Sequence, residues 1–263
     1  MAPTSILFYK EVGHSQEAAK EVTSLLEAGA FDGPKPIRLL TRLLTLANLD
    51  HEAIILDFFS GSGTTAHAVM QLNAKDGGRR KFIMVQIPEA CNDKSEAFRA
   101  GYKNICEIGK ERIRRAGRKI KEEAGPTALN LDIGFRVLKL DSSNMKDVYY
   151  RPEEIMQIKV NPDGLIDNIK PDRTDEDLLL QAMLDLGIPL SAKITQDGPL
   201  FYVNDTYLIA CFGWVDTALI TDIAKKHPYY AVFRDATFVS DSAMVNFEQV
   251  FATYSPSTIR RVL

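Results

Sequence analysis

Hydrophobic and polar positions alternate along the chain in a way that predicts a mixed α/β fold. Short apolar runs at 54–57 and 82–87 predict strands, and the first is expected to be buried on both faces. The segment 64–73 between them predicts a helix, so this stretch has the order of a parallel strand–helix–strand unit. Ser15 is the expected N-cap of an earlier helix, and Pro36 the expected first residue of the next. Apolar residues at helical spacing predict further helices at 16–28, 36–47 and 101–123.

A second α/β pattern follows Gly125-Pro126, the sharpest break in the chain. We therefore expect two domains, with residues 1–125 in the first and a smaller accessory α/β domain at 130–263. Leu200–Val203 and Tyr207–Cys211, joined through Asn204-Asp205, predict a hairpin. The other expected elements are strands at 135–140, 229–234 and 258–262, helices at 175–186, 216–226 and 241–251, and a possible N-terminal strand at 6–9.

The richest candidate for chemistry is the turn between the strand at 54–57 and the helix at 64–73. Gly61 and Gly63 allow a sharp turn and the close approach of a ligand to the backbone. The helix that follows presents its free N–H groups to that ligand. This combination predicts a loop that binds a nucleotide-type cofactor.

The residues around these glycines narrow the choice of cofactor. Gly61-x-Gly63-x-x-Ala66 fits the dinucleotide fingerprint, but the position about 20 residues on is Gln86 rather than an acid. No Gly-Lys-Ser/Thr follows the glycines, which excludes a P-loop. Asp57 suits a cationic ligand and would repel a pyrophosphate. An NAD-dependent oxidoreductase and a non-catalytic assembly module stay open as alternatives, as does an ordinary tight turn.

Two motifs carry a resemblance to a known family. The run from Asp57 to Gly63, Asp-Phe-Phe-Ser-Gly-Ser-Gly, resembles the S-adenosyl-L-methionine loop of DNA amino-methyltransferases. Phe31–Pro36 (Phe-x-x-Pro-Lys-Pro), a helix and this loop resemble motif X followed by motif I of the β-class enzymes. Further segments are similar to the modification (Mod) subunit of type III restriction–modification systems, namely 13–18, 81–89, 232–235 and 246–249.

The resemblance implies a partial Rossmann-like methyltransferase sheet that binds S-adenosyl-L-methionine and serves methylation of adenine N6 in DNA. It implies that Lys35 holds the cofactor's carboxylate and that Phe31 and Pro36 shape the pocket. The ribose contact is left between Gln86 and Glu89. The cofactor-binding residues implied are Phe31, Lys35, Pro36, Asp57, Phe58, Phe59, Ser60, Gly61, Gly63, Thr64 and Gln86.

The catalytic loop of the β-class, an Asp/Asn/Ser-Pro-Pro-aromatic motif, has no counterpart here, because the sequence contains no Pro-Pro pair. Tyr229-Tyr230 after Pro228 is better explained as an apolar strand. We therefore expect no catalytic residue, and a C-terminal portion of a Mod subunit that is inactive alone. The expected partners are DNA, the upstream catalytic half, the restriction (Res) subunit and a second copy of the chain.

The composition restricts the class of protein but indicates no further functional residues. With 45% hydrophobic and 25% charged residues the chain is typical of soluble globular proteins, and it shows neither a membrane span nor a signal peptide. The expected location is cytoplasmic. Three scattered cysteines predict free thiols and no metal site. The basic residues of 101–123 predict either a solvated face or a DNA contact: Lys103, Lys110, Arg112, Arg114, Arg115, Arg118, Lys119 and Lys121.

Overall fold

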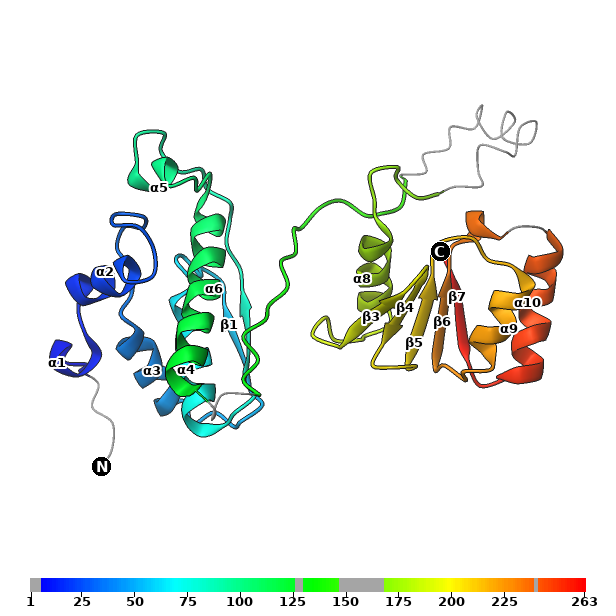
Figure 1. The fold of residues 1–263 in the computed structure, drawn as a ribbon, viewed down its shortest axis with the longest axis horizontal. Coiled ribbons are helices and arrows are strands. Elements are labelled where there is room, and N and C mark those ends of the chain that lie inside the picture. The colour runs from blue at the N-terminus through cyan, green and yellow to red at the C-terminus, as the bar shows by residue number, and fades with distance from the viewer. Residues whose placement is uncertain (1–5, 126–129, 147–167, 239–240) are drawn as a thin grey trace. The chain divides into compact units, whose positions relative to one another are not determined.

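The computed structural model describes residues 6–125, 130–146, 168–238 and 241–263. The chain divides into two compact units, Met1–Leu138 and Lys139–Leu263, which are described separately (Figure 1). Both mix helices with strands, so the predicted α/β class is confirmed.

The first unit is built on two parallel strands joined by a helix. β1 (Ile54–Asp57) pairs with β2 (Lys81–Met84) in a register from Ile54↔Lys81 to Asp57↔Met84. The connecting helix α4 (Thr64–Asp76) is three residues longer than the sequence pattern predicts and ends at Gly77 in the left-handed conformation. β2 is shorter than predicted, because its regular pairing ends at Met84.

The two faces of this small sheet differ. Ile55 and Phe82 pack on the buried Ala68 and Val69 of α4. On the opposite face Ile54 and Leu56 are 62% and 47% exposed. The prediction that the first strand is buried on both faces is therefore wrong for the described part of the chain, where helices cover one face of the sheet.

The helices of the first unit begin and end slightly differently from the sequence prediction. His14, not Ser15, is the N-cap of the second helix, and its Nδ1 accepts a hydrogen bond from Glu17 N. Pro36 is an N-cap rather than the first helical residue. Ile6–Tyr9 forms no strand. The helices are α1 (Tyr9–Val12), α2 (Ser15–Thr23), α3 (Ile37–Leu46), α5 (Glu96–Arg99) and α6 (Ile105–Ala124).

Helix α6 contributes four buried residues to the larger hydrophobic core of the first unit. It lies against α4 (Figure 1), and its buried face carries the predicted apolar stripe. It begins at Ile105 rather than 101, because Gly101 has a positive φ and Asn104 caps the first turn. The predicted strand at 135–140 is absent; Phe135 instead packs beside this core. The core residues include Val22, Met70, Ile108, Ile113, Ala116 and Ile120.

The second unit is a five-stranded mixed sheet in the order β3-β4-β5-β6-β7. The first three strands are antiparallel, and β5, β6 and β7 are parallel. The predicted hairpin is confirmed, with Asn204 and Asp205 at positive φ in its turn. The strands are β3 (Ile194–Asp197), β4 (Leu200–Val203), β5 (Leu208–Cys211), β6 (Tyr230–Phe233) and β7 (Ile259–Val262).

Helices cover both faces of this sheet (Figure 1). α8 (Asp175–Asp185) packs on one face, where Leu179 meets Phe201 and Val232. α9 (Thr217–Ala224) and α10 (Asp241–Tyr254) cover the other. Among the described strands of this unit, β3 was not predicted, because Ile194-Thr195-Gln196-Asp197 has a single apolar residue.

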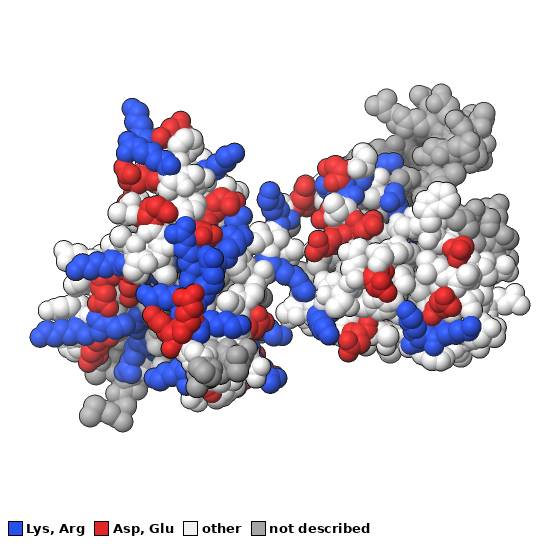
Figure 2. Space-filling model, viewed as in Figure 1, with Lys and Arg blue, Asp and Glu red and all other residues white. Residues whose placement is uncertain are grey.

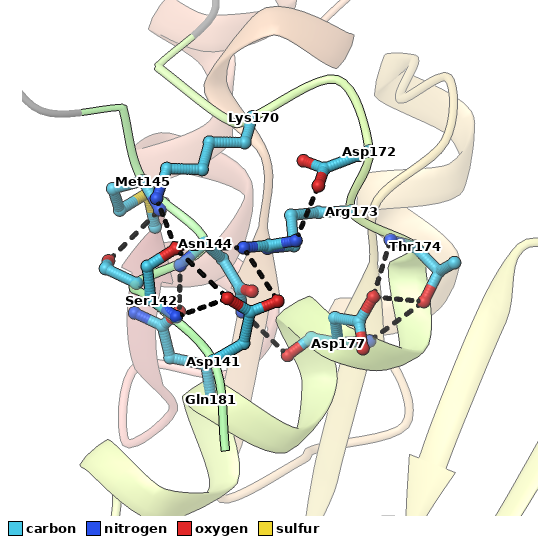
Figure 3. Close-up of polar contacts among 11 residues, drawn as sticks. Asp141, Ser142, Asn144, Met145, Lys170, Asp172, Arg173, Thr174, Asp177 and Gln181 are labelled. Atoms are coloured by element: carbon cyan, nitrogen blue, oxygen red, sulfur yellow. Dashed lines mark hydrogen bonds and ion pairs between the residues drawn. The ribbon is translucent and has the colours of Figure 1, made fainter. Parts of the chain in front are cut away.

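A polar network joins the first residues of the second unit to the start of α8 (Figure 3). The largely buried Arg173 pairs with Asp172 at 2.8 Å and with Asp141 at 3.5 Å. Thr174 and Asp177 form a capping box at the first turn of α8. The network therefore fixes the entry of the chain into the sheet.

Three further observations concern the described residues only. No helix among them is long and apolar enough to cross a membrane. No group of three or more metal-ligating side chains occurs among them. Cys91, Cys106 and Cys211 are free thiols.

Candidate functional site

The candidate site is the loop from Asp57 to Thr64, here named the Gly61 loop, at the carboxyl end of β1. Its backbone is held to the residue that follows β2, because Ser60 N donates to Val85 O at 3.1 Å. Gly63 N then donates to Ser60 O at 2.7 Å, which closes a tight turn into α4. Gly61 and Gly63 have φ values of 49° and 78°, a region that favours glycine.

Close packing also requires these two glycines. A Cβ on Gly61 would lie 3.2 Å from Cζ of Phe31, and a Cβ on Gly63 would lie 3.1 Å from Cγ1 of Ile113. Gly109 of α6 is equally constrained, since a Cβ there would lie 3.1 Å from the carbonyl oxygen of Gly61. The loop is thus held between Phe31 on one side and α6 on the other.

Asp57 shapes the loop from within. Its Oδ1 accepts a hydrogen bond from Phe59 N at 3.1 Å, and its Oδ2 accepts one from Thr65 Oγ1 at 2.6 Å. The half-buried carboxylate therefore links the end of β1 to the first turn of α4.

Gln86, an expected ribose contact, is engaged with the loop itself. Its Oε1 accepts a hydrogen bond of 2.8 Å from Gly61 N, and its Nε2 donates to Ile87 O at 3.2 Å. The side chain of Glu89 is exposed nearby in sequence.

The segment Phe31–Pro36 lies against the Gly61 loop, as the sequence predicted for two parts of one site. Besides the contact of Phe31 with Gly61, Thr64 Oγ1 donates to the main-chain oxygen of Lys35 at 3.3 Å. The Lys35 side chain is exposed and Pro36 is buried.

Not every predicted residue is brought into a shared enclosure. Phe58 and Phe59 are 64% and 87% exposed. A hollow of about 330 Å³ lies between α2 and the segment 29–34, and of the predicted cofactor-binding residues only Phe31 is among those that line it. The Gly61 loop is therefore exposed at Phe58 and Phe59 but buried at Ser62 and Thr64.

Arg112 is the residue that the sequence interpretation missed. It was assigned to the basic surface of α6, yet its side chain is fully buried. Its Nη1 donates to Ser62 Oγ at 2.5 Å and to Thr64 Oγ1 at 2.7 Å. The helical spacing could have predicted this burial, because Arg112 is four residues from both Ile108 and Ala116 on the buried stripe.

The other cations of α6 gather on its surface, with acidic side chains between them (Figure 2). Lys110 pairs with Glu107 at 2.7 Å, and Arg115 with Glu111 at 2.7 Å. Arg114 lies over the ring of Phe135. Lys103 precedes the helix rather than belonging to it. These contacts account for much of the basic cluster within the unit itself.

His67 is a second buried polar side chain close to the site. It is 4% exposed, and its Nδ1 has no hydrogen-bond partner among the described residues. Burial, together with the smaller effects of the positive charges of Arg112 and Lys119, lowers the pKa of His67 to about 3. The imidazole is therefore neutral at pH 7.

Comparison with known proteins shows a similarity to DNA methylases over part of the chain. Residues 4–116 match the family model described as DNA methylase. The StyLTI Mod subunit of a type III restriction-modification enzyme, from Salmonella typhimurium, is 45% identical over 129 residues, 49% of this chain and 19% of that protein. The EcoPI Mod subunit of Escherichia phage P1 is 41% identical over 136 residues, 52% of this chain and 20% of its own length.

A further, less similar relative is also a methyltransferase by name. The type II methyltransferase M.KpnI of Klebsiella pneumoniae is 36% identical over 101 residues, 38% of this chain and 24% of that protein. The chain spans about a fifth of the length of the curated relatives it matches. The resemblance predicted from the Gly61 loop and Phe31–Pro36 is confirmed: the chain is similar to DNA methylases, and in particular to the Mod subunits of type III restriction-modification enzymes.

Proposed function

We propose that this chain is the S-adenosyl-L-methionine-binding portion of a DNA adenine-N6 methyltransferase of the Mod-subunit kind. The observation that carries the proposal is the convergence of two separate segments, Phe31–Pro36 and the Gly61 loop, through Phe31–Gly61 packing and the Thr64–Lys35 hydrogen bond. Both segments lie within the residues that match the DNA methylase model.

The chemistry of the loop suits such a cofactor. Bound S-adenosyl-L-methionine would supply an electrophilic methyl group. Lys35 would pair with its carboxylate, and the first turn of α4 adds backbone N–H groups, because Gly63 provides no side-chain cap. Asp57 holds the loop in shape and places negative charge beneath it, which suits a sulfonium or ammonium group.

Glu89 is the better candidate for the ribose contact. Gln86 has its amide oxygen committed to Gly61 N at 2.8 Å. A carboxylate such as that of Glu89 can accept charge-assisted hydrogen bonds from ribose hydroxyls, which an amide cannot.

The bare face of the first sheet supports a role for further polypeptide. Parallel strands are normally covered on both faces and belong to larger sheets, whereas Ile54, Leu56 and Ile83 are exposed on β1 and β2. We propose that the upstream catalytic half of the subunit covers this face and adds strands to complete a Rossmann-like sheet. It would also bring the Pro-Pro-aromatic loop that this sequence lacks.

The remaining partners follow from the similarity to Mod subunits. DNA would be the substrate, the Res subunit a partner, and the second unit an accessory domain used for self-association. We keep 1–125 and 130–263 as the proposed functional domains, although Leu131, Ile133 and Phe135 pack against the core of the first compact unit.

A methyl-transfer assay tests the proposal. Radiolabelled S-adenosyl-L-methionine and mixed genomic DNA are incubated with this chain, with a separately expressed upstream half of a Mod subunit, and with both. We expect labelling only when both polypeptides are present. Orientation of the base and stabilisation of its developing charge each lower the activation free energy by several kcal/mol. Robust labelling by the chain alone would contradict the assignment of the catalytic loop to other polypeptide.

A further inference from the structure

Arg112 is a buried cation without a carboxylate within ion-pair distance among the described residues. Its side chain is fully buried, and it lies on the apolar stripe of α6 between Ile108 and Ala116. Burial of an unpaired charge is costly, and apolar residues of similar volume usually fill such positions at least as well. Burial accordingly lowers the pKa of Arg112 to about 10, which still leaves the side chain charged at pH 7.

The guanidinium uses only part of its hydrogen-bonding capacity. Nη1 serves the two hydroxyls of Ser62 and Thr64, while Nε and Nη2 have no protein partner among the described residues. Glu21 is the carboxylate whose charge acts on Arg112, but its Oε2 accepts the hydrogen bond of Ile37 N at 2.9 Å. The positive charge behind the Gly61 loop is therefore not neutralised by an ion pair within the described chain.

The two hydroxyls connect Arg112 to both segments of the site. Because Ser62 and Thr64 accept from Arg112, their own protons point elsewhere. Thr64 Oγ1 donates to the Lys35 oxygen at 3.3 Å, and the Ser62 and Thr64 oxygens lie 3.5 Å apart. A continuous polar chain thus runs from α6 through the first turn of α4 to the main chain of Lys35.

We infer that Arg112 is a positioning residue that acts through Ser62 and Thr64, and that its charge favours a ligand with a carboxylate at the Lys35 end of the Gly61 loop. The inference rests on the proposed function and extends it to one residue and one ligand group. The buried charge acts through a medium of low polarity, so it contributes to the potential at the loop although a ligand does not touch it.

The test compares two ligands on the whole chain. Calorimetry measures the affinities of S-adenosyl-L-methionine and of decarboxylated S-adenosyl-L-methionine, which keeps the sulfonium and amine but lacks the carboxylate. The variants are Arg112→Met, Arg112→Lys and, as a matched control on the exposed side of α6, Arg118→Met. Thermal unfolding of each variant reports its stability.

We expect Arg112→Met to weaken S-adenosyl-L-methionine by about tenfold, the factor that corresponds to 1.4 kcal/mol, and to leave the decarboxylated ligand unchanged. Arg112→Lys keeps the charge and should retain most of the affinity, and Arg118→Met should bind as the parent does. The melting temperature of Arg112→Met should equal or exceed that of the parent, because an unpaired buried charge is removed.

Other results distinguish the role of Arg112 from the proposed function of the chain. Equal loss for both ligands, or loss of stability that parallels loss of binding, would assign Arg112 a purely structural role and overturn the inference while the proposed function stands. A parent chain that binds neither ligand would remove the proposed function, and the inference would fall with it.

Discussion

The amide oxygen of Gln86 accepts a hydrogen bond of 2.8 Å from the backbone nitrogen of Gly61. One of the two side chains that the sequence offers for the cofactor's ribose, Gln86, thus holds the turn between β1 and α4. A residue at this position could support the loop or bind the ribose, and the sequence motif does not distinguish these two roles.

Substitution of Gln86 and Glu89 distinguishes these roles. We expect Gln86→Leu to lower the free energy of unfolding by about 1 kcal/mol, because Gly61 N loses its acceptor. Glu89→Gln, at an exposed position, should leave stability unchanged and weaken S-adenosyl-L-methionine binding. Urea unfolding and calorimetry give the two numbers. Normal stability with strongly reduced binding in Gln86→Leu would return the ribose contact to Gln86.

Alanine at Gly63 tests the close packing of the loop on α6. Both Gly63 and Gly77 have positive φ, but a Cβ meets Ile113 at 3.1 Å only at Gly63, whereas nothing lies within 4 Å at Gly77. We expect Gly77→Ala to cost about 1 kcal/mol, and Gly63→Ala to cost about 1–3 kcal/mol more through overpacking. Equal costs in chemical denaturation would show that the loop does not pack on α6 as described.

His67 should make the first unit sensitive to acid. Its pKa is lowered to about 3 in the folded state from an ordinary 6.5, so only the unfolded state binds the proton between these values. Stability is therefore complete above about pH 6.5 and falls as the pH drops, by about 2 kcal/mol at pH 5. His67→Gln, which does not titrate, should lose less stability between pH 7.5 and 5 in urea unfolding. An identical loss in parent and variant would contradict the buried neutral imidazole.

Self-association of the chain is a further expectation. The sequence of the second unit contains no catalytic motif that we recognise. Its surface exposes two large apolar side chains, Trp214 (83%) and Leu184 (62%). Sedimentation of the whole chain across a range of concentrations should show a dimer at high micromolar concentration, and Trp214→Ser should weaken it. A strict monomer throughout that range would refute self-association.

The sequence predicted the local features whose cause is local. The strand at 54–57, the glycine turn and the stripe on α6 follow from hydrophobic periodicity and backbone freedom, and they are found where expected. Element ends were less accurate, because caps decide them: His14 replaced Ser15, and Asn104 set the start of α6.

The features that the sequence did not predict depend on packing between distant segments. From the sequence, Arg112 is one of several cations on a helix surface. Its role is shown only by its buried contact with Ser62, which lies 50 residues away in the sequence. The strand expected at 135–140 is absent because Phe135 packs beside α6 instead of joining a sheet. Similarly, nothing in the apolar run of β1 showed that Ile54 and Leu56 would lie on an exposed face.

The most direct measurement is calorimetric titration of the parent chain and of Asp57→Ala with S-adenosyl-L-methionine and, separately, with NAD. Asp57 holds Phe59 N and Thr65 Oγ1, so its loss should weaken S-adenosyl-L-methionine by roughly 1–3 kcal/mol, the range for a hydrogen bond to a charged group. We predict that the parent binds S-adenosyl-L-methionine, that Asp57→Ala binds it more weakly, and that NAD gives no heat of binding. Binding of NAD in place of S-adenosyl-L-methionine, or equal affinity in the parent and in Asp57→Ala, would contradict the assignment of the Gly61 loop as a methyl-donor site.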